Sequence, residues 1–195
     1  ETLLDVVQWH FDRGVTGLRC DIAGFSPPSL WKLVRRSVKA RDPDAMMLAE
    51  LIPPLPEFFD DGFDLAYDST TFFNLRDAFA QGGNFDGVDG ALEDSTRFVE
   101  RAQGERTRHS VRQDDVLFMR YIDNQDEDRF LLRASGDLRK ARSVASVLMT
   151  IPGVPLITYG NEVGIKELRG RYPFALYNED TDTFSDGGID ALRKH

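Results

Sequence analysis

The fold is decided by residues 15–22, VTGLRCDI, a short and mostly apolar segment that closes on Asp21. It follows residues 3–11, whose apolar side chains recur at helical spacing, and this helix is expected to stop near Gly14. A short apolar run bounded by such breaks is typical of a buried strand. Residues 15–22 therefore predict a strand that carries a carboxylate at its carboxyl end.

The same alternation continues along the chain and predicts further strands and helices. Strands are expected at residues 45–51, 63–67, 116–122 and 154–159. Helices are expected at residues 30–38 with Ser29 as the cap, at 72–79, at 90–103, and at 138–148 with Asp137 as the cap. Residues 161–190 are the least regular and predict a long loop before a short terminal helix. Strands that alternate with helices indicate a parallel sheet with helical crossovers.

The length of the chain limits which parallel sheet it can form. The chain has 195 residues, whereas a closed barrel of eight parallel strands takes roughly 250. The prediction is therefore an α/β fold that is either an open doubly wound sheet or part of a barrel. Both place their chemistry at the carboxyl ends of the strands. No Pro-, Gly- or Ser-rich linker divides the sequence, so residues 1–195 are expected to form one domain.

Composition excludes several classes of protein. A net charge of −9 argues against nucleic acid or an anionic membrane surface as the main partner, because binding there depends on clustered cations. The sequence contains no run of eighteen apolar residues, so it predicts no membrane-spanning helix. A single cysteine rules out a disulfide framework within the chain. Residues 1–11 lack the basic start and apolar centre of a signal peptide. The sequence leaves the compartment open, with the cytoplasm slightly favoured.

Carboxylates follow the first two predicted strands. Arg19 and Asp21 are two residues apart, so both project to the same face, where the guanidinium favours an ionised carboxylate. Glu50 follows the apolar residues 46–49, an environment that favours the protonated form of a carboxyl group. One ionised and one protonatable carboxyl group are the pair that glycoside hydrolysis requires.

Each acidic residue also has an ordinary structural interpretation. An aspartate at a strand end is more often a helix cap or a turn former, and Glu50 could equally be a solvated residue that opens a loop. Asp123, Asp126 and Asp128 are consistent with a charged surface turn or a calcium loop, although the Asp-x-Asp-x-Asp-Gly pattern is missing. The three histidines are too far apart in the sequence for a zinc pattern.

Four segments in order carry a resemblance to a known family. They are GLRCDIA at residues 17–23, LAE at 48–50, FMRYIDNQD at 118–126 and IPGVPLITYGNE at 151–162. Together they resemble segments of the fourth, fifth, seventh and eighth barrel strands of the α-amylase family of glycoside hydrolases, glycoside hydrolase family 13. The resemblance implies a TIM (β/α)8 barrel of which this chain represents strands four to eight. The missing amino-terminal half of the barrel would then belong to a longer enzyme.

The resemblance also implies catalytic roles. Asp21 would be the nucleophile that forms a covalent glycosyl-enzyme intermediate, and Arg19 would orient it. Glu50 would be the general acid and then the general base. Asp126 would stabilise the distorted sugar and the oxocarbenium-like transition state. Such a reaction retains the anomeric configuration, which requires the carboxyl groups of Asp21 and Glu50 to lie about 5–5.5 Å apart.

The substrate-binding residues implied by the resemblance are less specific. Asn124 is expected to be a supporting polar residue. Gln125 stands where most family members have histidine, and it can hydrogen-bond to sugar hydroxyls but cannot become charged. Phe25, Phe58 and Tyr159 are candidates for stacking on sugar rings, with packing in the core as the alternative for each.

The function implied is that of a retaining α-glycoside hydrolase or transglycosylase that acts on α-glucans or α-glucosides. Its partner would be an oligo- or polysaccharide. No cofactor is expected to be required, and calcium is possible. Gly24-Phe25 replace the Lys-His seen in many α-amylases, which makes an endo-acting, calcium-dependent starch enzyme less favoured. The isolated 195-residue piece is expected to be inactive. A non-catalytic module that binds sugar or protein, an inactive fragment, and an open α/β domain with chance acidic turns remain as alternatives.

Overall fold

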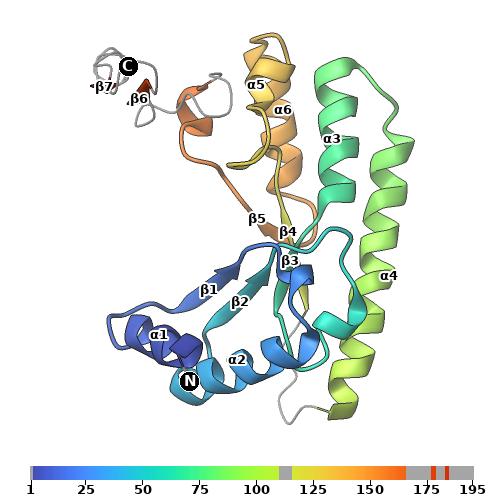
Figure 1. Cartoon of the computed structure of the whole chain (residues 1–195). Coiled ribbons are helices and arrows are strands. Elements are labelled where there is room, and N and C mark those ends of the chain that lie inside the picture. Colours follow the sequence, from blue (N-terminus) through green and yellow to red (C-terminus); the bar gives the residue numbers. More distant parts are fainter. Residues whose placement is uncertain (1, 110–115, 166–176, 179–182, 185–195) are drawn as a thin grey trace. The chain divides into compact units, whose positions relative to one another are not determined.

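The computed structural model describes residues 2–109, 116–165, 177–178 and 183–184, and these form two compact units (Figure 1). The first unit comprises Glu1–Thr71 and Asp89–Arg120. The second comprises Phe72–Val88 and Tyr121–His195. The prediction that residues 1–195 form a single domain stays a prediction.

The first unit is built on a parallel sheet in the order β1-β2-β3-β4. Its strands are β1 (Gly17–Cys20), β2 (Met46–Ala49), β3 (Leu65–Tyr67) and β4 (Leu117–Arg120). In the register of β1 and β2, Gly17 lies opposite Met46 and Cys20 opposite Ala49. A Cβ at Gly17 would lie 2.8 Å from the Met46 carbonyl oxygen, so a larger residue would push the two strands apart. The two strands therefore end side by side at the same edge.

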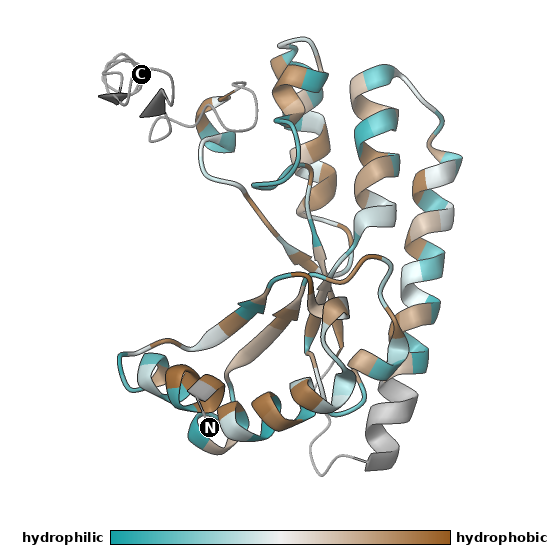
Figure 2. Cartoon of the chain, viewed as in Figure 1, coloured by the Kyte–Doolittle hydropathy of each residue, from teal (hydrophilic) through white to brown (hydrophobic). Residues whose placement is uncertain are grey.

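Helices cover this sheet and supply its core. They are α1 (Thr2–Phe11), α2 (Pro28–Arg41), the start of α3 (Ser69–Gln81) and most of α4 (Asp86–His109). Val34 and Val38 of α2 are buried in the same cluster as Met47 of β2. Phe98 of α4 lies 5.4 Å from Phe118 of β4 between ring centroids. Figure 2 shows apolar and polar residues alternating along these helices, as amphipathic packing requires.

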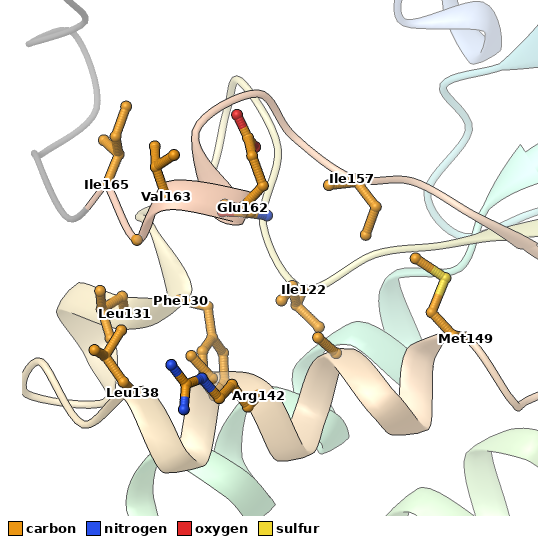
Figure 3. Close-up of a pocket in the computed structure, with 14 residues that line it drawn as sticks. Ile122, Phe130, Leu131, Leu138, Arg142, Met149, Ile157, Glu162, Val163 and Ile165 are labelled. Atoms are coloured by element: carbon orange, nitrogen blue, oxygen red, sulfur yellow. The ribbon is translucent and has the colours of Figure 1, made fainter. Parts of the chain in front are cut away.

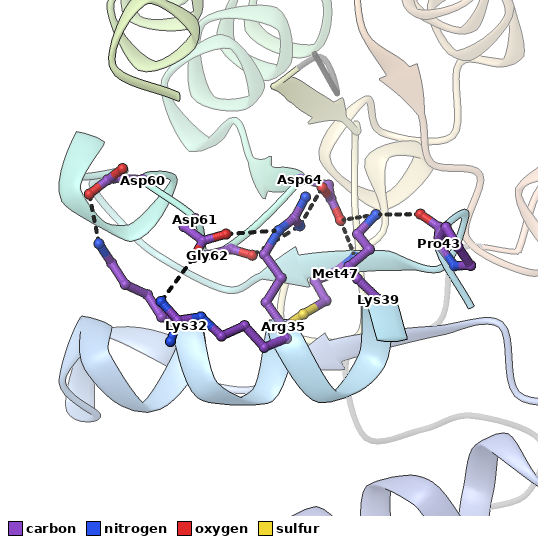
Figure 4. Close-up of polar contacts among 10 residues, drawn as sticks. Lys32, Arg35, Lys39, Pro43, Met47, Asp60, Asp61, Gly62 and Asp64 are labelled. Atoms are coloured by element: carbon purple, nitrogen blue, oxygen red, sulfur yellow. Dashed lines mark hydrogen bonds and ion pairs between the residues drawn. The ribbon is translucent and has the colours of Figure 1, made fainter. Parts of the chain in front are cut away.

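A buried ion pair ties α2 to the amino-terminal end of β3. The Arg35 guanidinium donates to Asp64 at 2.6 Å, and the Met47 amide donates to the other carboxylate oxygen at 2.9 Å (Figure 4). Lys39 lies 3.5 Å from the same carboxylate. Burial by itself would raise the pKa of Asp64, but the charge and hydrogen bond of Arg35, with the other two donors, outweigh it and lower that pKa.

The second unit contains shorter elements. They are the rest of α3, α5 (Phe130–Arg133), α6 (Leu138–Leu148), β5 (Val154–Pro155), the 3₁₀ turn η3 (Asn161–Val163), and the antiparallel pair β6 (Tyr177–Asn178) and β7 (Thr183–Phe184). Phe72 of α3 stacks on Tyr121 with ring centroids 4.6 Å apart. Lys140 of α6 donates to the Ala80 carbonyl oxygen at 2.8 Å, which joins α6 to α3.

Most of the predicted elements are confirmed, with shorter strands. Asp137 caps α6 as predicted, because its side chain accepts from the Arg139 amide at 2.9 Å. Ser29 is wrong as the cap of α2, since that helix begins at Pro28 and has Pro27 at the cap position. The strand predicted at residues 154–159 is confirmed only as β5, two residues long.

Other differences have local causes. The helix predicted from residue 72 begins at Ser69, because Asp68 accepts from the Thr71 amide at 3.0 Å and so caps the first turn. Helix α5 was not predicted, since four residues show no period. Strands β6 and β7 lie within the predicted loop 161–190. The predicted terminal helix lies outside the described residues. None of the helices in the described parts is both long and apolar enough to cross a membrane.

We expect Asp64→Asn to lower the free energy of unfolding by about 3–5 kcal/mol at pH 7, because it removes the charge opposite the buried Arg35 guanidinium. The wild-type contribution is fully present above the ordinary carboxyl pKa of about 3.9, and it is lost as the pH falls through the lower pKa of the folded protein. Urea unfolding between pH 7 and pH 3 measures both effects.

Asp12→Asn is the control, since Asp12 and Arg41 form an ion pair at 2.9 Å with both side chains more than half exposed. Such a pair contributes at most about 1 kcal/mol. Equal losses in the two variants would contradict the role given to Asp64.

Candidate active site

One arginine holds two carboxylates where β1 and β2 end. Arg19 is in β1, and its guanidinium forms an ion pair and hydrogen bond with Asp21. Its second terminal nitrogen lies 3.1 Å from Oε2 of Glu50, the residue directly after β2. The in-register pairing of β1 and β2 brings Arg19 close to Glu50, because it places Cys20 opposite Ala49. The first unit therefore brings together Arg19, Asp21 and Glu50, as the sequence predicts.

The Glu50 carboxyl group is oriented from a second side. Its Oε2 atom accepts from the Ile22 amide at 2.9 Å. Ile22 has φ 42° and ψ 51°, the left-handed region, which is strained for a β-branched residue. The backbone directly after Ile22 is also held to Glu50, since the Ala23 amide donates to the Glu50 carbonyl oxygen at 2.9 Å. Local strain is thus used to aim a backbone donor at this carboxylate.

The two carboxylates differ in exposure. The Asp21 side chain is 71% exposed, whereas that of Glu50 is 23% exposed. Solvent can therefore reach the Asp21 carboxylate, while Glu50 is sheltered. The separation of about 5–5.5 Å required for the two carboxyl groups stays a prediction.

Tyr67 is a further member of this group that the sequence analysis missed. It ends β3, and its hydroxyl forms a hydrogen bond with the Arg19 guanidinium, which lies 5.7 Å from the centroid of its ring. Burial by itself would lower the pKa of Arg19, but the contacts with Tyr67, Asp21 and Glu50 raise it. Arg19 therefore stays charged. The available signal was that Tyr67 is the last residue of a predicted strand, at the same edge.

Cys20 points away from the two carboxylates. The residue is 8% exposed and belongs to the core, as strand alternation predicts. Burial raises the pKa of its thiol to about 11, which the positive charge of Arg19 only partly offsets. The thiol is therefore protonated at neutral pH and packs as a small apolar group.

Another arginine, Arg120, is buried and holds the carboxyl ends of β3 and β4. Arg120 forms an ion pair with Asp68 and donates to the hydroxyl groups of Thr71 and Ser95, both at 3.0 Å. Burial lowers the pKa of Arg120 to about 10, so it remains charged at neutral pH. These contacts join β4 to α3 and α4 within the first unit.

The other predicted catalytic acid lies in the second unit, in a turn built by its neighbours. The Asp126 amide donates to the Asn124 side chain at 2.8 Å, and Gln125 donates to the Asp126 carboxylate at 2.6 Å. Asn124 is buried, while Gln125 and Asp126 are exposed. Asn124 therefore shapes the turn that presents Asp126 to solvent.

Asp123 does not belong to a surface turn. It is fully buried and lies 3.5 Å from the Arg129 guanidinium, so the surface-turn interpretation is wrong for this residue. The sequence analysis missed Arg129 and Asn161, which both contact Asp123. Their separation of 32 residues along the chain left no local pattern to find.

The aromatic candidates fall into two groups. Phe25 is 91% exposed and Tyr159 is 50% exposed, so both rings are accessible to a ligand. Phe58 is 5% exposed and belongs to the core of the first unit, which confirms the packing alternative for this residue.

A pocket of about 460 Å³ lies in the second unit between α6 and the segment that contains η3 (Figure 3). Its walls are mostly apolar, including Ile122, Leu138 and Met149, and its charged lining residues are Arg142 and Glu162. None of the predicted site residues lines it. An apolar groove of this kind does not match the polar surface that sugars require.

The described residues contain no group of three or more His, Cys, Asp or Glu side chains placed to hold a metal ion. No step of the chemistry is assigned to a metal ion.

The paired carboxylates lie at the carboxyl edge of a parallel sheet, which is the edge where parallel α/β enzymes place their chemistry. The chain belongs to the alpha-amylase family, because the family model "Alpha amylase, catalytic domain" matches residues 1–191. This is a family of glycosidases with a TIM-barrel catalytic domain.

Two relatives illustrate the match. Alpha-amylase MalA of Haloarcula japonica is 35% identical over 184 residues, which are 93% of this chain and 25% of the relative. Neopullulanase 2 of Thermoactinomyces vulgaris is 28% identical over 177 residues, 85% of this chain and 27% of the relative. The chain thus spans about a quarter of the length of these relatives.

Solved structures share the fold. The cyclic alpha-maltosyl-(1→6)-maltose hydrolase of Arthrobacter globiformis, in complex with its named substrate, aligns with a TM-score of 0.73 and 21% identity, over 98% of this chain and 41% of that one. An Anoxybacillus alpha-amylase aligns with a TM-score of 0.72 and 19% identity, over 99% and 41% of the two chains. The parallel α/β arrangement is therefore that of TIM-barrel amylases.

We expect Cys20 in the folded protein to react with iodoacetamide on the order of 100-fold more slowly at pH 8 than after unfolding in guanidinium chloride, because the raised pKa leaves little thiolate and burial blocks access. Mass spectrometry of the peptide that contains Cys20 follows the reaction. Equal rates in the two states would contradict the buried, protonated thiol.

Proposed function

We propose that this chain represents strands four to eight of a TIM-barrel catalytic domain. The complete domain would be a retaining α-glycoside hydrolase or transglycosylase acting on α-glucans or α-glucosides. The observation that carries the proposal is the contact of Arg19 with both Asp21 and Glu50 at the ends of adjacent parallel strands. The amino-terminal half of the barrel would complete the site, so the 195-residue chain by itself is expected to be inactive.

In the first step, the Asp21 carboxylate attacks the anomeric carbon of the sugar. Glu50 donates a proton to the glycosidic oxygen, so that the leaving group departs as an alcohol and a covalent glycosyl-aspartate forms. Arg19 contacts the Asp21 carboxylate and orients it, and the exposure of Asp21 allows the attack. Arg19 and the Ile22 amide both contact Oε2 of Glu50, so we assign the proton transfer to Oε1.

In the second step, the Glu50 carboxylate takes a proton from water, or from a sugar hydroxyl in transglycosylation. The resulting nucleophile attacks the same anomeric carbon and releases Asp21. Two displacements retain the anomeric configuration. Asp126 would stabilise the positive charge that develops on the sugar ring in both steps.

The proposed substrate is a neutral oligo- or polysaccharide, which suits a chain with a net charge of −9. The exposed rings of Phe25 and Tyr159 would stack on sugars, while Asn124 and Gln125 would supply hydrogen-bonding groups near Asp126. The proposed chemistry uses carboxyl groups alone and needs no cofactor. A solved structure that aligns with this chain is consistent with this class of ligand, since the Arthrobacter hydrolase has also been solved in complex with maltose.

One observation favours a second function. Gln125 cannot become charged, so a sugar that contacts it gains no ionic assistance there. A non-catalytic module that binds sugar or protein would tolerate this residue. Binding without turnover by the complete gene product would support that alternative.

The decisive variant is Asp21→Asn in the complete gene product that contains this chain. We expect release of sugar from maltose, isomaltose and an aryl α-glucoside to fall by roughly 10³-fold or more, because the nucleophile is lost. NMR of the first product formed by the wild type should show the retained anomer.

The control is Asp12→Asn, an exposed residue that directly follows α1. It should leave turnover unchanged, and circular dichroism checks that both variants are folded. Unchanged turnover in Asp21→Asn would overturn the assignment of the nucleophile, and an inverted product would overturn the retaining mechanism.

A further inference from the structure

Asp123 is a buried carboxylate that connects two separate loops of the second unit. It is 0% exposed and accepts from the Phe130 amide at 2.9 Å and from the Asn161 side chain at 3.2 Å. Its carbonyl oxygen accepts from the Thr158 hydroxyl at 2.8 Å. The residue that begins the Asp126 loop is therefore held by side chains from the segment after β5.

Arg129 closes the same loop from its other end. It is 1% exposed, and its guanidinium lies 3.5 Å from the Asp123 carboxylate. The guanidinium also donates to the Tyr159 carbonyl oxygen at 2.7 Å and to the Asn161 side chain at 3.4 Å. It lies 5.1 Å from the centroid of the Tyr159 ring. The Arg129 side chain thus contacts three groups of the neighbouring loop, which are the Tyr159 carbonyl oxygen, the Asn161 side chain and the Tyr159 ring.

We infer that Arg129 is a positioning residue: its contacts with Asp123, Tyr159 and Asn161 tie the loop that carries Asp126 to the loop that carries Tyr159. The inference rests on the proposed function, in which Asp126 stabilises the transition state and Tyr159 stacks on sugar. Residues 123–129 span six peptide bonds, and both end residues are anchored to the same segment. The intervening turn is therefore held at its two ends.

The Arg129–Asp123 ion pair is buried, which favours a role in positioning the loop over a role in stabilising the fold. Taking two charges out of water offsets much of their attraction, so a buried ion pair is weak evidence for stability, whereas it does constrain geometry. Arg133 gives the contrast, since it pairs with Asp128 of the same loop at 2.6 Å but is 45% exposed. A pair of that kind contributes little and adapts easily.

The test is Arg129→Lys in the complete gene product, with Arg133→Lys as the matched control. Lysine keeps the charge but replaces the planar, forked guanidinium with a compact ammonium group that cannot reproduce its contact geometry. Because a misplacement of about 1 Å can cost on the order of 100-fold in rate, we expect kcat per folded molecule to fall by about 10–100-fold, with KM changed by less than about 3-fold. The control should stay within about 2-fold, since its pair is exposed.

A double-mutant cycle separates positioning from simple stabilisation. If Arg129 acts through Asp126, the loss in kcat caused by Arg129→Lys should be at least about 5-fold smaller in an Asp126→Asn background than in the wild type. A role in stability alone would lower the melting temperature and leave kcat per folded molecule unchanged. That result would overturn the inference.

Thr158→Val decides the question if Arg129→Lys does not fold. Valine keeps the shape of threonine and removes one hydrogen bond to Asp123. We expect kcat to fall by about 2–5-fold, in line with the loss of one hydrogen bond of about 1 kcal/mol, and an unchanged kcat would overturn the inference. Full activity of Asp21→Asn and Asp126→Asn would instead overturn the proposed function, whereas full activity of Arg129→Lys alone would overturn only the role of Arg129.

Discussion

The in-register parallel pairing of β1 with β2 is the constraint on which the candidate site depends. Gly17 allows the backbones to approach at the start of the pair, and the ladder continues to the amide of Glu50, which donates to the Cys20 carbonyl oxygen at 3.0 Å. A register shift of one residue would turn Arg19 and Asp21 to the opposite face. The contact of one guanidinium with two carboxylates therefore follows from backbone geometry.

Charged pairs serve different purposes at the two edges of the same sheet. At the amino-terminal end of β3, Arg35 and Asp64 are both almost fully buried, and their contacts hold α2 against the strands. At the carboxyl edge, Asp21 is 71% exposed while its partner Arg19 is partly buried. Burial fixes the first pair as part of the scaffold, whereas exposure leaves the second able to meet a ligand. This division is the one expected of parallel α/β enzymes, whose chemistry lies at the carboxyl ends of the strands.

The sequence predicted the features that depend on nearby residues. Arg19 and Asp21 were placed on one face by their spacing, Asp137 was recognised as a cap, and Cys20 was assigned to the core. The sequence failed where contacts join distant segments. Tyr67 reaches Arg19 across the intervening strand β2, and Arg129 reaches Asn161 across 32 residues, so neither contact leaves a local pattern. Asp123 was misread for the same reason, because its burial depends on Arg129 and Asn161.

The sequence by itself determined the alternation of strands and helices, the order of the four motifs and the acids that end the strands. These follow from side-chain period and residue type, which act over a few residues. Only the tertiary structure decided that Glu50 shares Arg19 with Asp21, that Phe58 belongs to the core, and that Asp123 is a buried anchor. Burial and hydrogen bonding between segments far apart in the chain depend on how the backbone brings them together, and no short stretch of sequence contains that information.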